Sequence, residues 1–367
     1  MHHKISFAGP WITEKEEAYV LDAVKHGWYD NFDGYIQKLE KTFADYIGVK
    51  YAIATHCCTH SLHLAAAALG LKEGDEVIVT DFSWVATAYT VAYTGAKCVF
   101  ADVEPETWTI DPACIRKAIT PKTKAIMLVH SFGQPAEMDE IMAIAKEYGL
   151  FVIEDAAPAV GAEYKGKKVG SFGDFSCFSF QGGKMTVGGE GGVLLTDNEE
   201  LYNRARLLAN MGRTDSQAVF WSDEIGFEYT ISNVSAALAL AQLERVNELM
   251  AKKRSLFARY DERLKDVEEI HIVRERKDCL SNYCYPSILL KDRTREERDG
   301  ILQAFRDVNI HARPAFPRMS RFPVFEQRFE NPVCKTVEEQ GISLPSAANM
   351  TLEDVDFVCD NLLRQLG

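Results

Sequence analysis

The sequence predicts an α/β protein whose large domain has a mostly parallel sheet between helices, followed by a smaller α+β C-terminal domain. Between about Tyr51 and Asp197, short apolar runs rich in β-branched residues alternate with helical stretches. Beyond Asp197, longer amphipathic segments replace this alternation. The chain has 367 residues, which is long enough to bury the cores of two domains without disulfides.

The alternating part supplies the strands and helices of the large domain in order. We expect strands within YAIAT (51–55), EVIVT (76–80), AKCVFADV (96–103), KAIMLVH (124–130) and LFVIEDAA (150–157). We expect helices within HSLHLAAAALG (60–70), WVATAYTVAYTG (84–95) and MDEIMAIAKEYG (138–149). Ligands of such sheets bind beyond the carboxyl ends of the strands, so the residues there are the first candidates for a site.

The second part begins with SNVSAALALAQLERVNELMAKKRSLFARYDERL (232–264), which predicts one helix of many turns leading to the small domain. A strand in YCYPSILL (283–290), a helix in TREERDGILQAFRDV (294–308) and a Pro-rich loop, RPAFPRMSRFPVF (313–325), follow it. We place the large domain at residues 1–249 and the small domain at 250–367, and the N-terminal segment can pack on the small domain.

Charge and composition argue against several classes of protein. The 54 acidic and 41 basic residues give a net charge of −13, which disfavours broad contact with nucleic acid or an anionic membrane. No apolar stretch reaches the roughly 18 residues that a membrane helix needs, and the first residues contain no signal-peptide core. The nine cysteines show no repeated spacing, which favours free thiols. We therefore expect a cytoplasmic protein with no membrane or nucleic-acid partner.

Asp155 ends the apolar run LFVIED. A carboxylate at the end of a buried strand is costly to desolvate unless a cation or a hydrogen-bond donor meets it. Asp155 is therefore a candidate partner for a cationic group of a ligand. A helix cap or a buried salt bridge is the alternative.

Lys184 follows an alternating apolar strand within the glycine-rich segment FSCFSFQGGKMTVGGEGGVLLTDN (175–198). The glycines allow the backbone to approach a ligand closely, and an amine in a confined pocket is available as a Schiff-base nucleophile. A solvated lysine on a flexible surface loop is the alternative. The spacing matches neither a Walker A loop nor a dinucleotide fingerprint.

A short strand gives way to an alanine-rich helix in ATHCCTHSLHLAAAALG (54–70). We expect Thr59 to be the N-cap, and the hydroxyls of Thr59 and Ser61 together with the free amides of the first turn would form an anion site. A metal site is the alternative, because several ligand-type side chains crowd here: His56, Cys57, Cys58, His60 and His63. No second ligand pair at zinc-like spacing occurs elsewhere, so we expect no metal.

Trp84 follows the strand EVIVT, again where ligands of a parallel sheet gather. Its indole would stack on a flat aromatic ligand. A tryptophan packed into the core is the alternative.

A Schiff-base lysine, a carboxylate for a pyridinium nitrogen, an anion site at a helix start and a stacking aromatic together meet the requirements of pyridoxal 5′-phosphate (PLP). The chain also resembles the DegT family of sugar aminotransferases, which are fold-type-I PLP enzymes, over nearly its whole length. The resemblance rests on these segments in this order: CTHSLHLAAAALGLKEGDEVIVTDFSWVATA, GAKCVFADVEPETWTIDP, HSFGQPAEMDEI, VIEDAAPAVGAEYKGKKVGSFGDFSCFSFQGGK, GEGGVLLTD and SNVSAALALAQLERV.

The resemblance implies a role for each matching residue. Lys184 would carry the cofactor, Asp155 would face its ring nitrogen, and Trp84 would stack on its ring. The phosphate would be bound by Ser179, Thr59 and Ser61, beside which Cys58 and His60 are also expected to contact the cofactor. The resemblance further implies a homodimer with active sites at the interface, reached by residues near 226–233 of the other subunit.

Some positions depart from the family pattern. Cys58 replaces a usual Gly and His60 a usual small residue, while Pro158 stands where many relatives have Gln near the ring hydroxyl of the cofactor. Glu228 occupies a position where an amide donor would approach a phosphate, so we do not assign it to the site. These departures concern local cofactor contacts and substrate choice.

The activity implied by the resemblance is transfer of an amino group from L-glutamate or L-glutamine to a keto-sugar, in its nucleotide-linked form, for amino-sugar or surface-polysaccharide biosynthesis. Arg313 is a candidate for binding a substrate carboxylate or phosphate, with a plain surface arginine as the alternative. Other acceptors are a cyclitol or a small keto or aldehyde phosphate. Two further alternatives are a sugar dehydratase, which would lack Lys184, and a non-catalytic regulator of the same fold.

Overall fold

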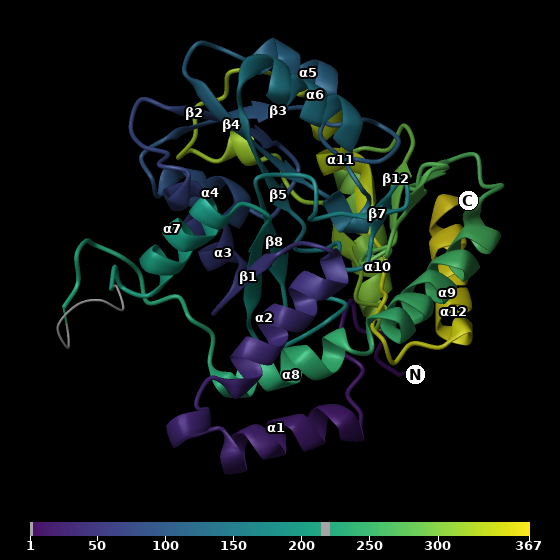
Figure 1. Cartoon of the computed structure of the whole chain (residues 1–367). Helices are drawn as coiled ribbons and strands as arrows, with labels where there is room; N and C mark the ends of the chain where they lie inside the picture. Colours follow the sequence, from purple (N-terminus) through teal and green to yellow (C-terminus); the bar gives the residue numbers. More distant parts are fainter. Residues whose placement is uncertain (1–2, 214–220) are drawn as a thin grey trace.

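The computed structural model describes residues 3–213 and 221–367 and contains one large central sheet (Figure 1). This sheet has seven strands in the order β1-β9-β8-β5-β4-β2-β3. Neighbours run parallel from β8 to β3, while β9 is antiparallel to both β8 and β1. The mostly parallel sheet predicted from the sequence is confirmed. The bounds of its strands are β1 Tyr51–Thr55, β2 Glu76–Thr80, β3 Lys97–Ala101, β4 Thr123–Val129, β5 Phe151–Asp155, β8 Phe175–Ser179 and β9 Gly192–Thr196.

Helices cover both faces of this sheet because its strands bury apolar side chains on each side. In β1, Ile53 packs with α3, α4 and α7, whereas Ala52 and Ala54 pack on the opposite face with α2 and α8. Helices α5 and α6 cover the far end of that opposite face, and α1 lies beneath α8 (Figure 1). The helices are α1 Glu14–His26, α2 Gly34–Ile47, α3 Cys58–Ala68, α4 Ala86–Ala92, α5 Pro112–Ala118, α6 Met138–Tyr148, α7 Glu199–Ala209 and α8 Asn233–Leu243.

A second sheet of four antiparallel strands forms after α8, in the order β10-β12-β14-β13. Its core also takes in Ile5, which pairs with Ile310, so the N-terminal segment packs on this part of the chain. A small three-stranded sheet, β11-β6-β7, links the two parts. The bounds are β6 Glu163–Tyr164, β7 Lys167–Lys168, β10 Ile270–Ile272, β11 Cys279–Leu280, β12 Ser287–Leu290, β13 Arg313–Pro314, β14 Gly341–Ser343, α9 Val246–Leu264, α10 Arg295–Asp307, α11 Pro332–Gln340 and α12 Leu352–Leu366, with 3-10 turns η1 Tyr29–Asn31, η2 Ser131–Gly133 and η3 Met319–Arg321.

The single long helix predicted over residues 232–264 is wrong. The chain forms α8 and α9, which are separated at Glu244 and Arg245. The Arg245 side chain turns back to Glu16 of α1 and to the carbonyl of Trp11, and its backbone leaves the helical region. The division predicted between residues 249 and 250 falls inside α9 and stays a prediction.

The carboxyl ends of the parallel strands place the candidate site residues together. Asp155 ends β5, opposite Val129 at the end of β4, and the His130 amide donates to the Asp155 carbonyl. Strand β2 ends at Thr80, shortly before the segment that carries Trp84 into α4. Within the described residues no helix combines the length and the apolar character needed to cross a membrane. All nine cysteines are free thiols.

Candidate active site

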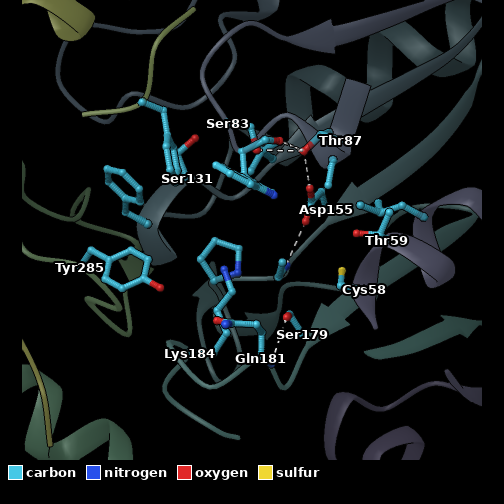
Figure 2. A pocket seen from close by; sticks show the side chains of 18 of the residues that line it. Cys58, Thr59, Ser83, Thr87, Ser131, Asp155, Ser179, Gln181, Lys184 and Tyr285 are labelled. Carbon is cyan, nitrogen blue, oxygen red and sulfur yellow. Dashed lines mark hydrogen bonds between the residues drawn. The ribbon is translucent and has the colours of Figure 1, made fainter. Parts of the chain in front are cut away.

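A cavity of about 370 Å³ opens at the carboxyl edge of the central sheet (Figure 2). Segments that follow β1, β2, β4, β5 and β8 form most of its wall. Tyr285, Arg313 and Phe316, from the part of the chain that forms the four-stranded sheet, also line it. Most of the residues predicted from the sequence line this cavity: Lys184, Asp155, Trp84, Thr59, Cys58, Ser179 and Arg313. The structure therefore brings together side chains that lie up to 255 positions apart in the sequence, from Cys58 to Arg313.

Asp155 is buried, with both carboxylate oxygens accepting hydrogen bonds. Thr87 Oγ1 donates to Oδ2 at 2.7 Å, and the Ala157 amide donates to Oδ1 at 3.1 Å. Burial raises the pKa of Asp155, while these two hydrogen bonds and the charge of Lys184 oppose the shift. Neither donor is a cation, so the salt-bridge alternative is not what the structure shows. A cationic N–H group of a ligand would stabilise the charged form of this carboxylate.

Lys184 lies in the tight turn after β8, where its amide donates to the Gln181 carbonyl at 2.8 Å. The side chain is half-buried and reaches into the cavity from the side opposite Asp155 in Figure 2. Its Nζ lies 5.8 Å from the centroid of the Tyr285 ring, and the Tyr285 hydroxyl donates to the Gly183 carbonyl at 2.9 Å. The lysine is thus held beside the cavity and is not a solvated residue of a surface loop.

Helix α3 points its start at the same cavity. It begins at Cys58, and its N-cap is Cys57, whose side chain makes no capping hydrogen bond. The prediction that Thr59 is the N-cap is therefore wrong, because Thr59 belongs to the first turn. A Cβ on Gly192 would come within 2.6 Å of Cys57 and Cys58 backbone atoms, so only glycine lets β9 approach this helix start. The uncapped amides at a helix start are suited to bind a phosphate.

Two predicted cofactor contacts lie away from the cavity wall. The Ser61 hydroxyl is buried and shares a 2.7 Å hydrogen bond with Thr55, and the His60 ring stacks on Tyr229 with 4.0 Å between centroids. Burial lowers the pKa of His60. The geometry does not favour a direct cofactor contact for either residue. Glu228 is exposed and also lies outside the cavity wall.

The structure also places Trp84, Pro158 and the ligand-type side chains considered for a metal site. Trp84 is 64% exposed at the cavity, so it is not a core tryptophan. Pro158 lines the cavity without offering a donor. Among the described residues, no group of three His, Cys, Asp or Glu side chains is arranged to hold a metal ion.

Sequence reasoning missed several residues of the wall. Thr87, three residues after Trp84, carries the hydrogen bond to Asp155, and Ser131, Gln181 and Tyr285 also line the cavity. In the sequence, a hydroxyl one helical turn after a candidate stacking residue only weakly indicates a role in the site. Nothing in the sequence connects Tyr285 with this cavity, because Tyr285 directly precedes β12 of the four-stranded sheet.

The cavity fits a PLP-sized group. Ser131 Oγ is buried at the wall without a hydrogen-bond partner among the described residues, so a bound polar group would satisfy it. A buried carboxylate, a half-buried amine and an uncapped helix start match a ring nitrogen, an aldehyde and a phosphate. In Figure 2, Asp155 lies between Ser131 and Thr59, and Lys184 lies below them beside Gln181.

Comparison with known proteins decides the family. The model of the DegT/DnrJ/EryC1/StrS aminotransferase family matches residues 10–363. The chain belongs to this family. It is 38% identical to a GDP-perosamine synthase of Escherichia coli O157:H7, over 96% of each chain. It is 34% identical to the putative pyridoxal phosphate-dependent aminotransferase EpsN of Bacillus subtilis, over 99% of this chain and 96% of that one.

Solved structures of aminotransferases agree with the fold. The aminotransferase TlmJ from Streptoalloteichus hindustanus superposes with a TM-score of 0.94 at 27% identity, over 99% of both chains. PseC of Helicobacter pylori, an aminotransferase involved in the biosynthesis of pseudoaminic acid, superposes with a TM-score of 0.91 at 25% identity, also over 99% of both chains. The resemblance stated from the sequence, the fold-type-I architecture and the aminotransferase class are confirmed.

Proposed function

We propose that this DegT-family aminotransferase uses PLP to move an amino group from L-glutamate or L-glutamine to a nucleotide-linked keto-sugar in polysaccharide biosynthesis. The observation that carries the proposal is the single cavity in which Lys184, Asp155 and the start of α3 meet. Relatives named GDP-perosamine synthase, from Escherichia coli and Caulobacter vibrioides, are each 38% identical over at least 96% of the chain and favour a GDP-linked acceptor.

The chemistry begins with two residues. Bound PLP supplies an aldehyde that receives the amino group and a ring that takes up electrons from the donor. Lys184 Nζ holds the cofactor between reactions. Once the donor has displaced this amine, Lys184 Nζ would be free to accept the proton from the donor α carbon and to donate it again during the transfer. Asp155, oriented by Thr87, keeps the ring nitrogen protonated by pairing a negative charge with it.

The other wall residues position the cofactor. Thr59 and Ser179 hydroxyls, with the free amides at the start of α3, bind the phosphate. The indole of Trp84 covers one face of the ring and excludes water from it. Cys58 lines this end of the cavity with a buried thiol whose pKa is raised well above its usual range by burial, so it remains protonated and acts as a small apolar wall.

The protein acts, in this proposal, as a cytoplasmic homodimer whose active sites lie at the interface. The exposure of Trp84 beside the cavity supports this arrangement, because a partner subunit would cover a ring that is 64% exposed in one chain. Analytical ultracentrifugation of the holoenzyme checks the state of assembly, and we expect a dimer.

The experiment is a pair of half-reactions on the holoenzyme. We expect L-glutamate to convert the cofactor to its amine form, with loss of the visible absorbance and release of 2-oxoglutarate. GDP-linked and UDP-linked keto-sugars are then added, and the acceptor is the sugar that restores the absorbance. Lys184→Ala should abolish the first step, whereas Lys335→Ala, an exposed lysine on α11, should leave it unchanged.

The same experiment separates the other candidate functions. If a cyclitol or a small keto phosphate restores the absorbance and no nucleotide sugar does, that compound is the acceptor. Loss of water from the sugar without amination would indicate a dehydratase, although retention of Lys184 speaks against it. A protein that binds no PLP and releases no 2-oxoglutarate would indicate a non-catalytic regulator.

A further inference from the structure

Residues 282–285 form a short segment, called the bridge below, that lies just before β12 of the four-stranded sheet. At one end of the bridge, Asn282 is buried, and its Nδ2 donates to the carbonyls of Pro158 and Val160, each at 2.9 Å. Pro158 is the third residue after Asp155 and lines the cavity. This end of the bridge therefore holds the loop that continues from Asp155.

The other end of the bridge holds the turn that carries Lys184. The Tyr285 hydroxyl donates to the carbonyl of Gly183, the residue before Lys184, at 2.9 Å. In Figure 2, Tyr285 lies on the other side of the cavity from Asp155. The Phe7 ring stacks on the Tyr285 ring with 4.9 Å between centroids and limits its movement. One short segment thus contacts both loops that carry the central residues of the site.

The conformation of the bridge is closely constrained. The Cys284 amide donates to Asn282 Oδ1 at 2.9 Å. Gly133 has a φ of +96°, and a Cβ there would come within 1.9 Å of Asn282 Oδ1, so glycine is needed for this approach. Tyr283 has a φ of 47°, which side chains other than glycine rarely adopt, and its ring stacks on Phe257 with 3.5 Å between centroids. Backbone strain of this kind persists where the surroundings fix it, and it clusters at functional sites.

A buried amine holds the bridge from behind. Lys253 of α9 is 3% exposed, and its Nζ donates to the Cys284 carbonyl at 3.1 Å. It also donates to the carbonyl and the hydroxyl of Ser346, at 2.5 and 2.9 Å. None of these three acceptors is a carboxylate, and burial lowers the pKa of Lys253 to about 8. Burying a cation among neutral acceptors is costly, and an apolar side chain of similar size would avoid the cost, so the amine indicates a role beyond packing.

We propose that the bridge sets the spacing between Asp155 and Lys184, and that Lys253 is a positioning residue that holds the bridge through the Cys284 carbonyl. The inference rests on the roles of Asp155 and Lys184 in the proposed function. In PLP the aldehyde is attached opposite the nitrogen of a rigid ring, so these two residues must be held about one ring apart. The rate of a reaction between bound groups depends steeply on such placement.

Hydrogen exchange of the cofactor-free full-length protein, followed by mass spectrometry of its peptides, tests the proposal without relying on catalysis. Tyr285→Phe removes one hydroxyl and should speed exchange of the Lys184 amide by about fivefold or more. Asn282→Ala should do the same for the Ala159 amide, and Lys253→Met should speed exchange at both loops. If Asn282→Ala does not fold, the phenylalanine and methionine variants decide the question.

The alternative is ordinary packing, in which the loss of a buried hydrogen bond loosens the whole chain alike. Two matched variants control for it. Tyr35→Phe removes a hydroxyl that donates to Asp22 at 2.8 Å, and Lys252→Met removes the amine beside Lys253 that donates to the Met350 carbonyl at 2.7 Å. Neither hydrogen bond involves the bridge, so exchange at both loops should stay as in the wild type. Equal acceleration in bridge and control variants, or none in the bridge variants, would overturn the proposal.

Kinetics of the PLP-loaded enzyme complete the test. At saturating glutamate, the rate of the glutamate half-reaction should fall by about tenfold in Lys253→Met and in Tyr285→Phe, with KM within about twofold of the wild type. A higher KM with unchanged rate and unchanged exchange would mean that Tyr285 acts on the substrate directly, against the proposal. If glutamate fails to convert the wild-type cofactor, the proposed function fails, and the exchange experiment still decides whether the bridge holds the two loops.

Discussion

Thr87 donates a hydrogen bond to Asp155, with 2.7 Å between Oγ1 and Oδ2, and thereby joins α4 to the end of β5. The other carboxylate oxygen is fixed by the Ala157 amide. Because Asp155 is only 4% exposed, water cannot take the place of either donor easily. The direction of the carboxylate toward the cavity is therefore set by one hydroxyl and one amide.

Replacement of Thr87 tests this relationship. Thr87→Val keeps the shape of the side chain but leaves Asp155 Oδ2 without its donor, which costs about 1–3 kcal/mol for a buried group. We expect PLP to bind about tenfold more weakly, measured by fluorescence titration. Thr87→Ser keeps the hydroxyl and should bind PLP as the wild type does. Equal affinity in the valine and serine variants would show that Thr87 does not position the carboxylate.

Asp155→Asn tests the charge itself. The amide keeps the size of the side chain but cannot stabilise a protonated ring nitrogen, so we expect the glutamate half-reaction to slow by on the order of 10²-fold or more. A PLP analogue methylated at the ring nitrogen carries a permanent positive charge and should restore part of the rate in the variant. Stopped-flow absorbance measures both rates. No recovery with the analogue would argue against ring protonation as the role of Asp155.

Replacement of Ser131 should affect the stability of the cofactor-free and the PLP-loaded protein differently. Its buried hydroxyl has no partner among the described residues, so Ser131→Ala should leave the melting temperature of the cofactor-free protein equal or slightly higher. The gain in melting temperature on adding PLP should be smaller than in the wild type, with cofactor affinity lower by about threefold to tenfold. Differential scanning fluorimetry with and without PLP measures both. An unchanged gain would mean that Ser131 does not contact the cofactor.

Glu16 makes stability depend on pH. Burial alone would raise its pKa, but hydrogen bonds from Thr13, Arg245 and Gln242 outweigh burial and lower the pKa to about 2. Because the folded pKa lies below the ordinary value of 4.5, the stabilisation is complete above pH 4.5 and is lost as the pH falls toward 2.

Glu16→Gln should therefore lower the free energy of unfolding by about 2–3 kcal/mol at pH 7. The difference from the wild type should shrink as the pH falls below 4.5. Guanidinium denaturation at a series of pH values measures it. Glu17→Gln removes an exposed carboxylate of the same helix and should have little effect. A difference for Glu16→Gln that does not change with pH would contradict the ionic origin of this stabilisation.

The sequence predicted the central strands well because they are buried on both faces. Runs such as EVIVT and YAIAT are continuous and apolar, and they coincide with β2 and β1. The break between α8 and α9 was missed, since helical periodicity continues through it. The break depends on Arg245 reaching Glu16, which lies 229 residues earlier in the sequence and is brought near only by the fold.

Some residues of the site could be predicted from the sequence and others could not. Asp155 and Lys184 could be found because a charge at the end of an apolar strand and a lysine among glycines each break a local pattern. Thr87 and Ser131 do not stand out from their neighbours in the sequence. Their roles in the site depend on which atoms they face in the folded chain. Thr59 was misplaced as a cap because Cys57, an uncommon N-cap residue, holds that position.

The covalent link between Lys184 and the cofactor is the claim on which the account depends most. Reduction of the PLP-loaded enzyme with sodium borohydride fixes such a link, and peptide mass spectrometry then locates it. We predict one phosphopyridoxyl group per chain, on Lys184 and on no other lysine. A label on a different lysine, or a fully loaded enzyme that gives no labelled peptide, would contradict the account.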